Sequence, residues 1–221
     1  MNPVEVTSIQ WFPGHMAKTR RIISENLKLV DLVLEIVDAR IPKSSRNPEL
    51  NEWISDKPRI IMLNKCDNAD AKMTKEWLDF YKSNNIPALA CDCKTGTGVN
   101  NFMPLLKQVL KDLLLRREEK GMAGRSTRIM VVGIPNVGKS SFINRMAGIR
   151  RAKVEDRPGV TRIKQWVSLT KELDMLDMPG VLWPKFEDKL VGEKLAFTGA
   201  VKDDILDIEQ LAARLLQYLS E

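Results

Sequence analysis

The chain has 221 residues, of which 43% are hydrophobic and 29% charged, and its formal net charge is +6. This composition is that of an ordinary globular protein, so it argues against a disordered chain, and the length suits one large domain or two small ones. No apolar run approaches the ~18 residues of a membrane span, and the first residues lack the basic start of an export signal. We therefore expect a cytoplasmic protein that does not bind membranes, while three cysteines and one histidine are too few for a usual zinc site.

Short apolar runs alternate along the chain with stretches of helical apolar spacing. The runs predict buried strands at residues 32–37, 60–63, 86–90 and 129–132. The spacing predicts helices at residues 16–30, 74–82 and 102–115, and one or two more within 204–221. This alternation predicts an α/β fold with a mostly parallel sheet and helices on both faces. The polar stretch 116–128 has two glycines and no periodicity, which is typical of a linker.

A glycine-rich loop follows the strand predicted at 129–132 and precedes a helical stretch. Its sequence, GIPNVGKS from Gly133 to Ser140, matches G-x-x-x-x-G-K-[ST] in full. Gly133 and Gly138 let backbone N–H groups turn toward phosphate oxygens, Lys139 neutralises the β- and γ-phosphates, and the Ser140 hydroxyl binds Mg²⁺. The strand and helix on either side disfavour a chance glycine-rich turn. The predicted nucleotide contacts here are Gly133, Pro135, Asn136, Val137, Gly138, Lys139, Ser140 and Ser141.

Two later segments have the features of a γ-phosphate sensor. Asp177-Met-Pro-Gly180 follows a strand-like stretch, where a carboxylate holds Mg²⁺ through water and the Gly180 N–H meets the γ-phosphate. Between the two motifs, Thr161 lies on a Pro/Gly loop that would close over Mg²⁺ when that phosphate is present. A plain surface turn is the alternative for the Thr161 segment.

Guanine selectivity is predicted by Asn64-Lys65-Cys66-Asp67, which follows the strand at 60–63. The Asp67 carboxylate would accept two hydrogen bonds from guanine, and adenine has no matching donors. Lys65 would pack along the base, and Asn64 would tie this loop to the phosphate loop. Cys93 and Lys94, in the loop after the next strand, would also lie against the guanine. The motif argues against the other P-loop candidate, an ATP-dependent kinase.

The order of these motifs is unusual, because the base-recognition segments precede the phosphate loop instead of following it. Circular permutation is the simplest explanation, since it is tolerated where chain termini are close and exposed. We therefore predict a permuted Ras-like P-loop GTPase domain over residues 1–200. Within it we expect a base-recognition region at residues 1–115, a linker at 116–128 and a phosphate-binding region at 129–200, and the start of a C-terminal helical region follows at 201–221.

The motifs and their order resemble the circularly permuted GTPases, and within them the ribosome biogenesis GTPase A family. The resemblance covers nearly the whole chain and is carried by residues 11–18, 37–42, 45–48, 64–67, 133–141, 156–161 and 177–188. It implies a monomeric GTPase that acts in late assembly of the large ribosomal subunit, binds its rRNA and hydrolyses GTP on the particle. It also implies Mg²⁺ as cofactor and a C-terminal helical RNA-binding region longer than this chain provides.

Hydrolysis needs a group that positions the attacking water, and the residue after Gly180 is Val181, where Ras-like enzymes have a glutamine. We therefore expect slow intrinsic hydrolysis. The resemblance makes His15 a candidate catalytic residue, and the alternative is a histidine that only packs its turn. Asn136 is a candidate ligand for an activating K⁺, and the alternative is an ordinary loop residue. The predicted catalytic set is His15, Asn136, Lys139, Thr161 and Gly180, and the predicted Mg²⁺ ligands are Ser140, Thr161 and Asp177.

Two broader interpretations stay open at this point. Val181 also favours a guanine-nucleotide switch that docks on RNA or the ribosome without significant hydrolysis of its own. Asp38 and Arg40 end a strand on the nucleotide side of the sheet, where an ion pair within the fold is at least as good an interpretation as a catalytic role. Basic clusters near 18–21, 116–128 and 145–153 fit rRNA phosphates or solvated faces, and no aromatic platform interleaves them.

Overall fold

The computed structural model describes residues 14–54, 57–148, 164–180, 182, 188–201 and 206–220, with the side chains of 14–19 outside this description. The helices are α1 (Gly14–Leu27), α2 (Leu50–Ile54), α3 (Ala71–Ser83), α4 (Phe102–Val109), α5 (Lys111–Glu119), α6 (Lys139–Ala147), α7 (Lys189–Phe197) and α8 (Ile208–Ser220). The strands are β1 (Leu32–Asp38), β2 (Arg59–Asn64), β3 (Ala88–Cys91), β4 (Thr127–Val132), β5 (Gln165–Thr170) and β6 (Leu173–Asp177).

The strands form one sheet in the order β3-β2-β1-β4-β6-β5. Every neighbouring pair is parallel except β5 with β6. The chain therefore builds one side of the sheet from β1 to β3 and then returns to place β4 against the free side of β1. In open α/β sheets, ligands bind at the carboxyl ends of strands where the order reverses, which here is the region of β1 and β4. The predicted α/β fold with a mostly parallel sheet is confirmed.

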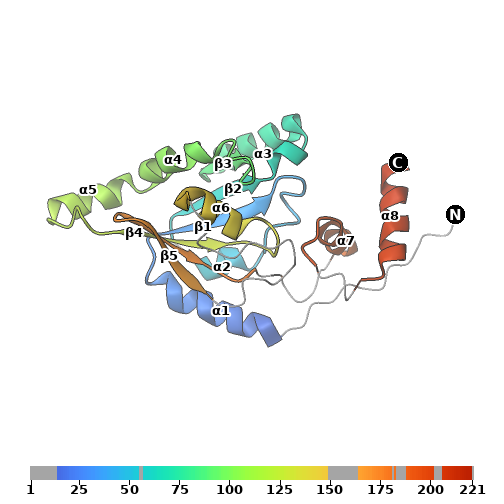
Figure 1. Ribbon diagram of the computed structural model, residues 1–221, viewed down its shortest axis with the longest axis horizontal. Helices are drawn as coiled ribbons and strands as arrows, with labels where there is room; N and C mark the ends of the chain where they lie inside the picture. Colours follow the sequence, from blue (N-terminus) through green and yellow to red (C-terminus); the bar gives the residue numbers. More distant parts are fainter. Residues whose placement is uncertain are drawn as a thin grey trace.

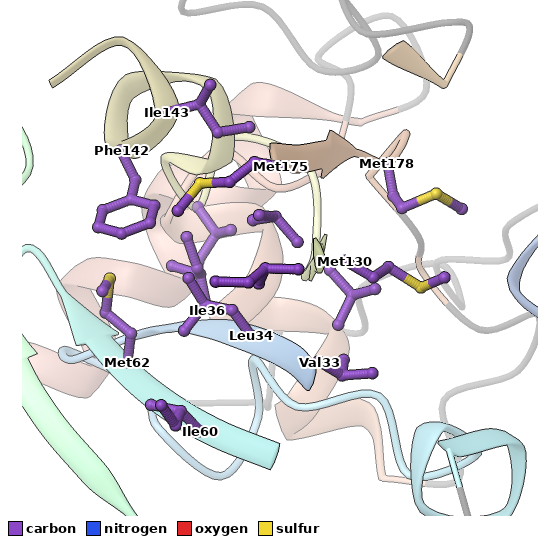
Figure 2. Close-up of a cluster of buried hydrophobic side chains, with 14 of the residues drawn as sticks. Val33, Leu34, Ile36, Ile60, Met62, Met130, Phe142, Ile143, Met175 and Met178 are labelled. Carbon is purple, nitrogen blue, oxygen red and sulfur yellow. The ribbon is translucent and has the colours of Figure 1, made fainter. Parts of the chain in front are cut away.

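Helices cover both faces of the sheet, with α1 and the α4–α5 pair on opposite sides in Figure 1. One face packs Leu34, Ile36 and Met62 against Phe142 of α6, as Figure 2 shows. The Phe142 ring meets Phe102 of α4 edge-to-face, with ring centroids 5.0 Å apart. On the other face a smaller cluster gathers Val37, Ala39, Ile61 and Leu63 around Tyr81 of α3. Strands buried on both faces explain the continuous apolar runs in their sequences.

The region between the predicted helix at 102–115 and β4 differs from the sequence expectation. Two helices, α4 and α5, meet at Leu110, and α5 runs on to Glu119. The boundaries of the predicted linker 116–128 are therefore wrong, because only residues 120–126 lie outside α5 and β4. Arg117 explains the extension: its buried guanidinium donates to Asp31 at 2.6 Å and fixes the last turns of α5 on the sheet. The division of the chain into domains stays a prediction.

Elements without an apolar run were not predicted. Strand β5 forms the antiparallel edge of the sheet and keeps most of its side chains exposed. Helices α2 and α7 are short, so their patterns are too brief to be diagnostic. The helical pattern in 204–221 is confirmed as α8. Within the described ranges, no helix is both long and apolar enough to cross a membrane.

Phe142 and Phe80 offer a matched test of the core. Phe142 is 0% exposed, whereas Phe80 on α3 is 51% exposed. Replacing Phe142 with alanine removes a buried ring and leaves a cavity, so we expect the free energy of unfolding to fall by about 3–5 kcal/mol. Phe80→Ala is the control and should change it by less than about 1 kcal/mol. Urea denaturation of both variants measures this, and equal losses would contradict the assignment of Phe142 to the core.

Candidate functional site

The loop between β4 and α6 is shaped by close contact with its neighbours. Gly133 has φ 152°, and a Cβ there would lie 2.4 Å from the Ile36 carbonyl oxygen on β1. Gly138 has φ 104°, and a Cβ there would lie 2.2 Å from Nδ2 of Asn64. Both positions therefore need glycine for space as well as for backbone conformation. The two glycines that the sequence assigns to phosphate binding also let the loop pack against β1 and β2.

Lys139 begins α6 and its side chain folds back under the loop. Nζ donates to the carbonyl oxygens of Gly133, at 3.1 Å, and Ile134, at 2.8 Å. Burial lowers the pKa of Lys139 from 10.5 to about 8, and the charge of Asp177 offsets only part of this effect. The ammonium is therefore held inside the loop, where anionic phosphates would raise its pKa again.

Asp177 ends β6 beside the start of α6 and has two different oxygens. Oδ2 accepts a hydrogen bond from the Ser140 hydroxyl at 2.8 Å. Oδ1 is buried and, among the described residues, has no hydrogen-bond partner. Burial raises the pKa of this carboxyl group. A buried carboxylate oxygen without a partner, next to a hydroxyl, fits a hard cation such as Mg²⁺, which prefers oxygen ligands.

The residues predicted for base recognition gather at the same edge of the sheet. The strand register places Asp38, Asn64 and Cys91 in one row at the carboxyl ends of β1, β2 and β3. The Asn64 side chain joins two loops: Nδ2 donates to the Val137 carbonyl at 2.7 Å, and Oδ1 accepts from the Cys93 N–H at 2.9 Å. The predicted tie between the base-recognition loop and the phosphate loop is thus present.

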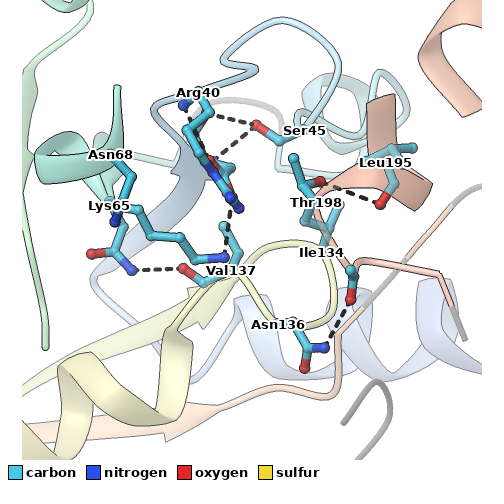
Figure 3. Close-up of polar contacts among 12 residues, drawn as sticks. Arg40, Ser45, Lys65, Asn68, Ile134, Asn136, Val137, Leu195 and Thr198 are labelled. Carbon is cyan, nitrogen blue, oxygen red and sulfur yellow. Dashed lines mark hydrogen bonds and ion pairs between the residues drawn. The ribbon is translucent and has the colours of Figure 1, made fainter. Parts of the chain in front are cut away.

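Asp38 is a site residue whose role the sequence left open. Its carboxylate binds the guanidinium of Arg40 at 2.7 Å and Nζ of Lys65 at 3.1 Å, as Figure 3 shows around Arg40 and Lys65. Burial alone would raise the pKa of Asp38, but the hydrogen bond from Arg40 and the charge of Lys65 outweigh it and lower the pKa. Lys65 has φ 63°, so its backbone turns sharply at the start of the Asp67 loop. The ion pair with Asp38 therefore fixes the Lys65 side chain, while the Asp67 side chain stays exposed.

The loop after β3 is held by Asp92 and by Arg145 of α6. The Asp92 carboxylate accepts from the N–H groups of Lys94, at 2.8 Å, and Thr95, at 2.9 Å. Arg145 donates to the carbonyl oxygens of Cys93 and Lys94. Sequence reasoning missed Arg145, because it lies 51 residues from Lys94 and no local pattern connects them.

Asn136 connects the phosphate loop to the C-terminal helices. It has φ 56°, and Nδ2 donates to the Gly199 carbonyl at 2.8 Å, as Figure 3 shows beside Ile134 and Val137. Gly199 is the second residue after α7, and α7 is joined to α8 by an ion pair between Glu193 and Arg214 at 3.2 Å. The Gly180 backbone also reaches the loop, because a Cβ there would lie 2.7 Å from Cα of Pro135.

Three predicted residues cannot be placed in this geometry. Thr161 and Val181 lie outside the described residues, and His15 belongs to the first turn of α1 with its side chain outside the description. The described residues bring together Asn64, Lys65, Cys93 and Lys94 on one side and Lys139, Ser140, Asp177 and Gly180 on the other. Their roles in nucleotide binding stay predictions.

Comparison with known proteins accounts for this arrangement. The family model for 50S ribosome-binding GTPases matches residues 128–218. Ribosome biogenesis GTPase A of Priestia megaterium is 53% identical over 214 residues, which cover 96% of this chain and 74% of that protein. The chain belongs to the ribosome biogenesis GTPase A family. The protein from Bacillus licheniformis with the same name is 52% identical, over 96% of this chain and 75% of that protein.

A solved relative confirms the permuted fold. The crystal structure of GNP-bound YlqF from T. maritima superposes with a TM-score of 0.65 and 28% identity, covering 92% of this chain and 75% of that one. The prediction of a circularly permuted P-loop GTPase of the ribosome biogenesis GTPase A family is therefore confirmed. With GTP as the substrate of that family, the edge formed by Asn64, Lys139 and Asp177 is the candidate GTP site.

The lowered pKa of Lys139 gives a pH test of this site. Below about pH 8 the ammonium is already present, so we expect GTP affinity to be nearly constant. Above about pH 8, binding must take up a proton, because phosphates favour charged Lys139, and affinity should fall by up to about tenfold per pH unit. Nucleotide titrations between pH 7 and 9.5 measure it. Lys139→Met is the control, with weak binding and no such fall. An unchanged affinity across this range in the unsubstituted protein would contradict the assignment.

Proposed function

We propose that this chain hydrolyses GTP as an assembly factor in late maturation of the large ribosomal subunit. The observation that carries the proposal is the Asn64 side chain, which couples the N-K-x-D loop to the phosphate loop. The match to 50S ribosome-binding GTPases supports the choice of the large subunit and its rRNA as partners. We propose that the chain acts there as a monomer, in the cytoplasm.

Each predicted binding residue of the loops has a definite task in this proposal. Asp67 reads the guanine edge, Lys65 lies along the base, and Cys93 and Lys94 close the other side of the base pocket. Lys139 leaves its carbonyl partners for the phosphates, and the Gly180 N–H meets the γ-phosphate. Ser140, Asp177 and Thr161 would hold Mg²⁺, which neutralises phosphate charge when bound.

Hydrolysis by the isolated chain should be slow, because Val181 has no group that can orient water. We propose that K⁺ and the ribosomal particle compensate. The Asn136 amide lies on the phosphate loop with its nitrogen directed to Gly199, and its oxygen is the atom that a cation would use. His15, at the start of α1, is the proposed residue that the particle brings to the attacking water.

A second candidate function is a guanine-nucleotide switch that docks on RNA or the ribosome without significant hydrolysis. Val181 favours it, since the residue leaves the attacking water without a partner. Such a switch would use the same binding residues and would differ only in turnover. Measurements of turnover therefore separate the two functions.

Replacing Asp67 with asparagine tests base recognition. The substitution turns a double acceptor into a group that matches xanthine, so we expect GTP affinity to fall by about 100-fold or more and XTP affinity to rise. The exposed Asp79→Asn on α3 is the matched control and should change neither affinity. Competition titrations with GTP, XTP and ATP measure both. Unchanged GTP preference in the Asp67 variant would remove this residue from the base site.

Single-turnover hydrolysis with and without large subunits, in K⁺ and in Na⁺, tests the reaction itself. We expect subunits and K⁺ each to raise the rate, because the particle would bring His15 to the attacking water and K⁺ would add a positive charge beside the phosphates. Asn136→Ala should remove the K⁺ dependence, and His15→Ala should leave GTP affinity unchanged while cutting the subunit-stimulated rate. No stimulation by either addition would favour the non-hydrolysing switch.

A further inference from the structure

Two adjoining hollows lie at the edge of the sheet opposite the nucleotide site. One has a volume of about 560 Å³ and lies where Pro58 leads into β2 and Pro87 leads into β3. The other, of about 420 Å³, continues from it along α3 and α4. They share the wall formed by residues 85–87 and Val109, so together they make one elongated depression, here called the basal groove.

The first half of the basal groove has an excess of positive charge. Arg46 and Arg59 both line it, and they share a single carboxylate, that of Glu35, at 3.1 and 3.5 Å. Glu35 is 1% exposed and does not line the groove, so it neutralises one guanidinium from behind. Burial lowers the pKa of Arg59, and the charge of Arg46 acts in the same direction against the attraction of Glu35. An anion in the groove would relieve this repulsion.

Lys57 adds a third cation to the same hollow. Its Nζ donates to the Val30 carbonyl at 2.8 Å, and it forms no ion pair with any carboxylate in the portion of the chain that the structure describes. The second hollow contributes Lys82 and one carboxylate, Asp79. Among described residues the whole groove thus has four cations, Arg46, Lys57, Arg59 and Lys82, against the single carboxylate of Asp79.

The remaining lining suits a chain-like ligand with apolar and polar portions. The lining includes prolines and aliphatic side chains, and the amides of Asn51, Asn85 and Gln108 offer hydrogen bonds beside them. The Asn51 carbonyl oxygen already accepts from Arg59 at 2.7 Å and from Arg46 at 3.3 Å, which fixes both guanidinium groups at the groove. A groove of two connected hollows with cations at both ends fits a strand of linked phosphates better than one small anion.

We propose that the basal groove binds a single-stranded RNA segment, with phosphates on Arg46, Lys57 and Arg59 and sugars and bases against the proline and aliphatic lining. The groove lies at the amino ends of β2 and β3, whereas Asn64 and Cys91 end these strands at the nucleotide site. RNA and GTP therefore bind at the same time. The source of the strand, rRNA of the large subunit, rests on the proposed function, but the strand-binding itself does not.

Fluorescence anisotropy with a labelled uridine oligonucleotide tests this inference, on the full chain saturated with GDP so that the nucleotide site is filled. Lys57→Gln with Arg59→Gln removes two groove cations, and Arg46 still pairs with Glu35, so the fold should persist. We expect RNA affinity to fall several-fold and the slope of log affinity against log salt to shrink by about 1.4, or about 0.7 per phosphate contact. GDP affinity should stay unchanged.

The matched control replaces Lys72 and Lys75 with glutamine, since both are exposed on α3 and neither lines the groove. Equal losses in the two double variants would mean diffuse charge attraction and would overturn the proposal. Displacement of the oligonucleotide by UMP at the same nucleotide concentration would also overturn it, because a single phosphate would then suffice. Equal affinity for duplex RNA would overturn it as well. Hydrolysis stimulated by large subunits is measured in a separate experiment. If that stimulation is absent, the proposed function fails, but a loss of RNA affinity specific to the groove variant still supports the groove. If the groove variant shows no specific loss, the groove proposal fails, but the proposed function is unaffected.

Discussion

The buried side chain of Asn64 is the contact on which the candidate site depends. One amide donates to the phosphate loop after β4 and accepts from the loop after β3, and it does so from the end of β2. The loops that it joins lie 73 and 29 residues away along the chain. Buried polar groups are costly unless they are paired, so the two hydrogen bonds of Asn64 favour this mutual position of the three loops.

Because of the permutation, the candidate nucleotide site is followed in the chain by the C-terminal helices. Because β4 lies between β1 and β6, the phosphate loop is at the centre of the sheet, and the chain beyond Gly180 leaves the sheet for α7 and α8. Asn136 contacts Gly199, two residues beyond α7, and Glu193 and Arg214 join α7 to α8. The predicted phosphate loop is thus linked to the C-terminal helices by two polar contacts, in addition to the packing of Leu195 and Val201 in the core.

The charged residues at the two ends of β2 are arranged differently. At its carboxyl end, Lys65 pairs with Asp38, and buried Lys139 donates to the carbonyl oxygens of Gly133 and Ile134 under the influence of the Asp177 charge. At its amino end, Arg46 and Arg59 share the carboxylate of Glu35. Lys57 donates to the Val30 carbonyl and forms no ion pair among the described residues. The first arrangement fits one nucleotide in a defined pose, whereas the second leaves charge available for a longer polyanion. The modest net charge of +6 does not reveal this division.

The sequence by itself determined the buried strands, the motifs and their displaced order. Strands buried on both faces and a G-x-x-x-x-G-K-S loop are local patterns, and their order along the chain requires no structure. The tertiary structure decided the contacts between distant residues: the pairing of Asp38 with Lys65, the hold of Arg145 on Lys94, and the extension of α5 by Arg117 and Asp31. It also decided the edge strand β5 and the basal groove. These features arise where segments distant in the sequence meet. The local sequence pattern around a charged side chain does not predict which distant residue it will contact.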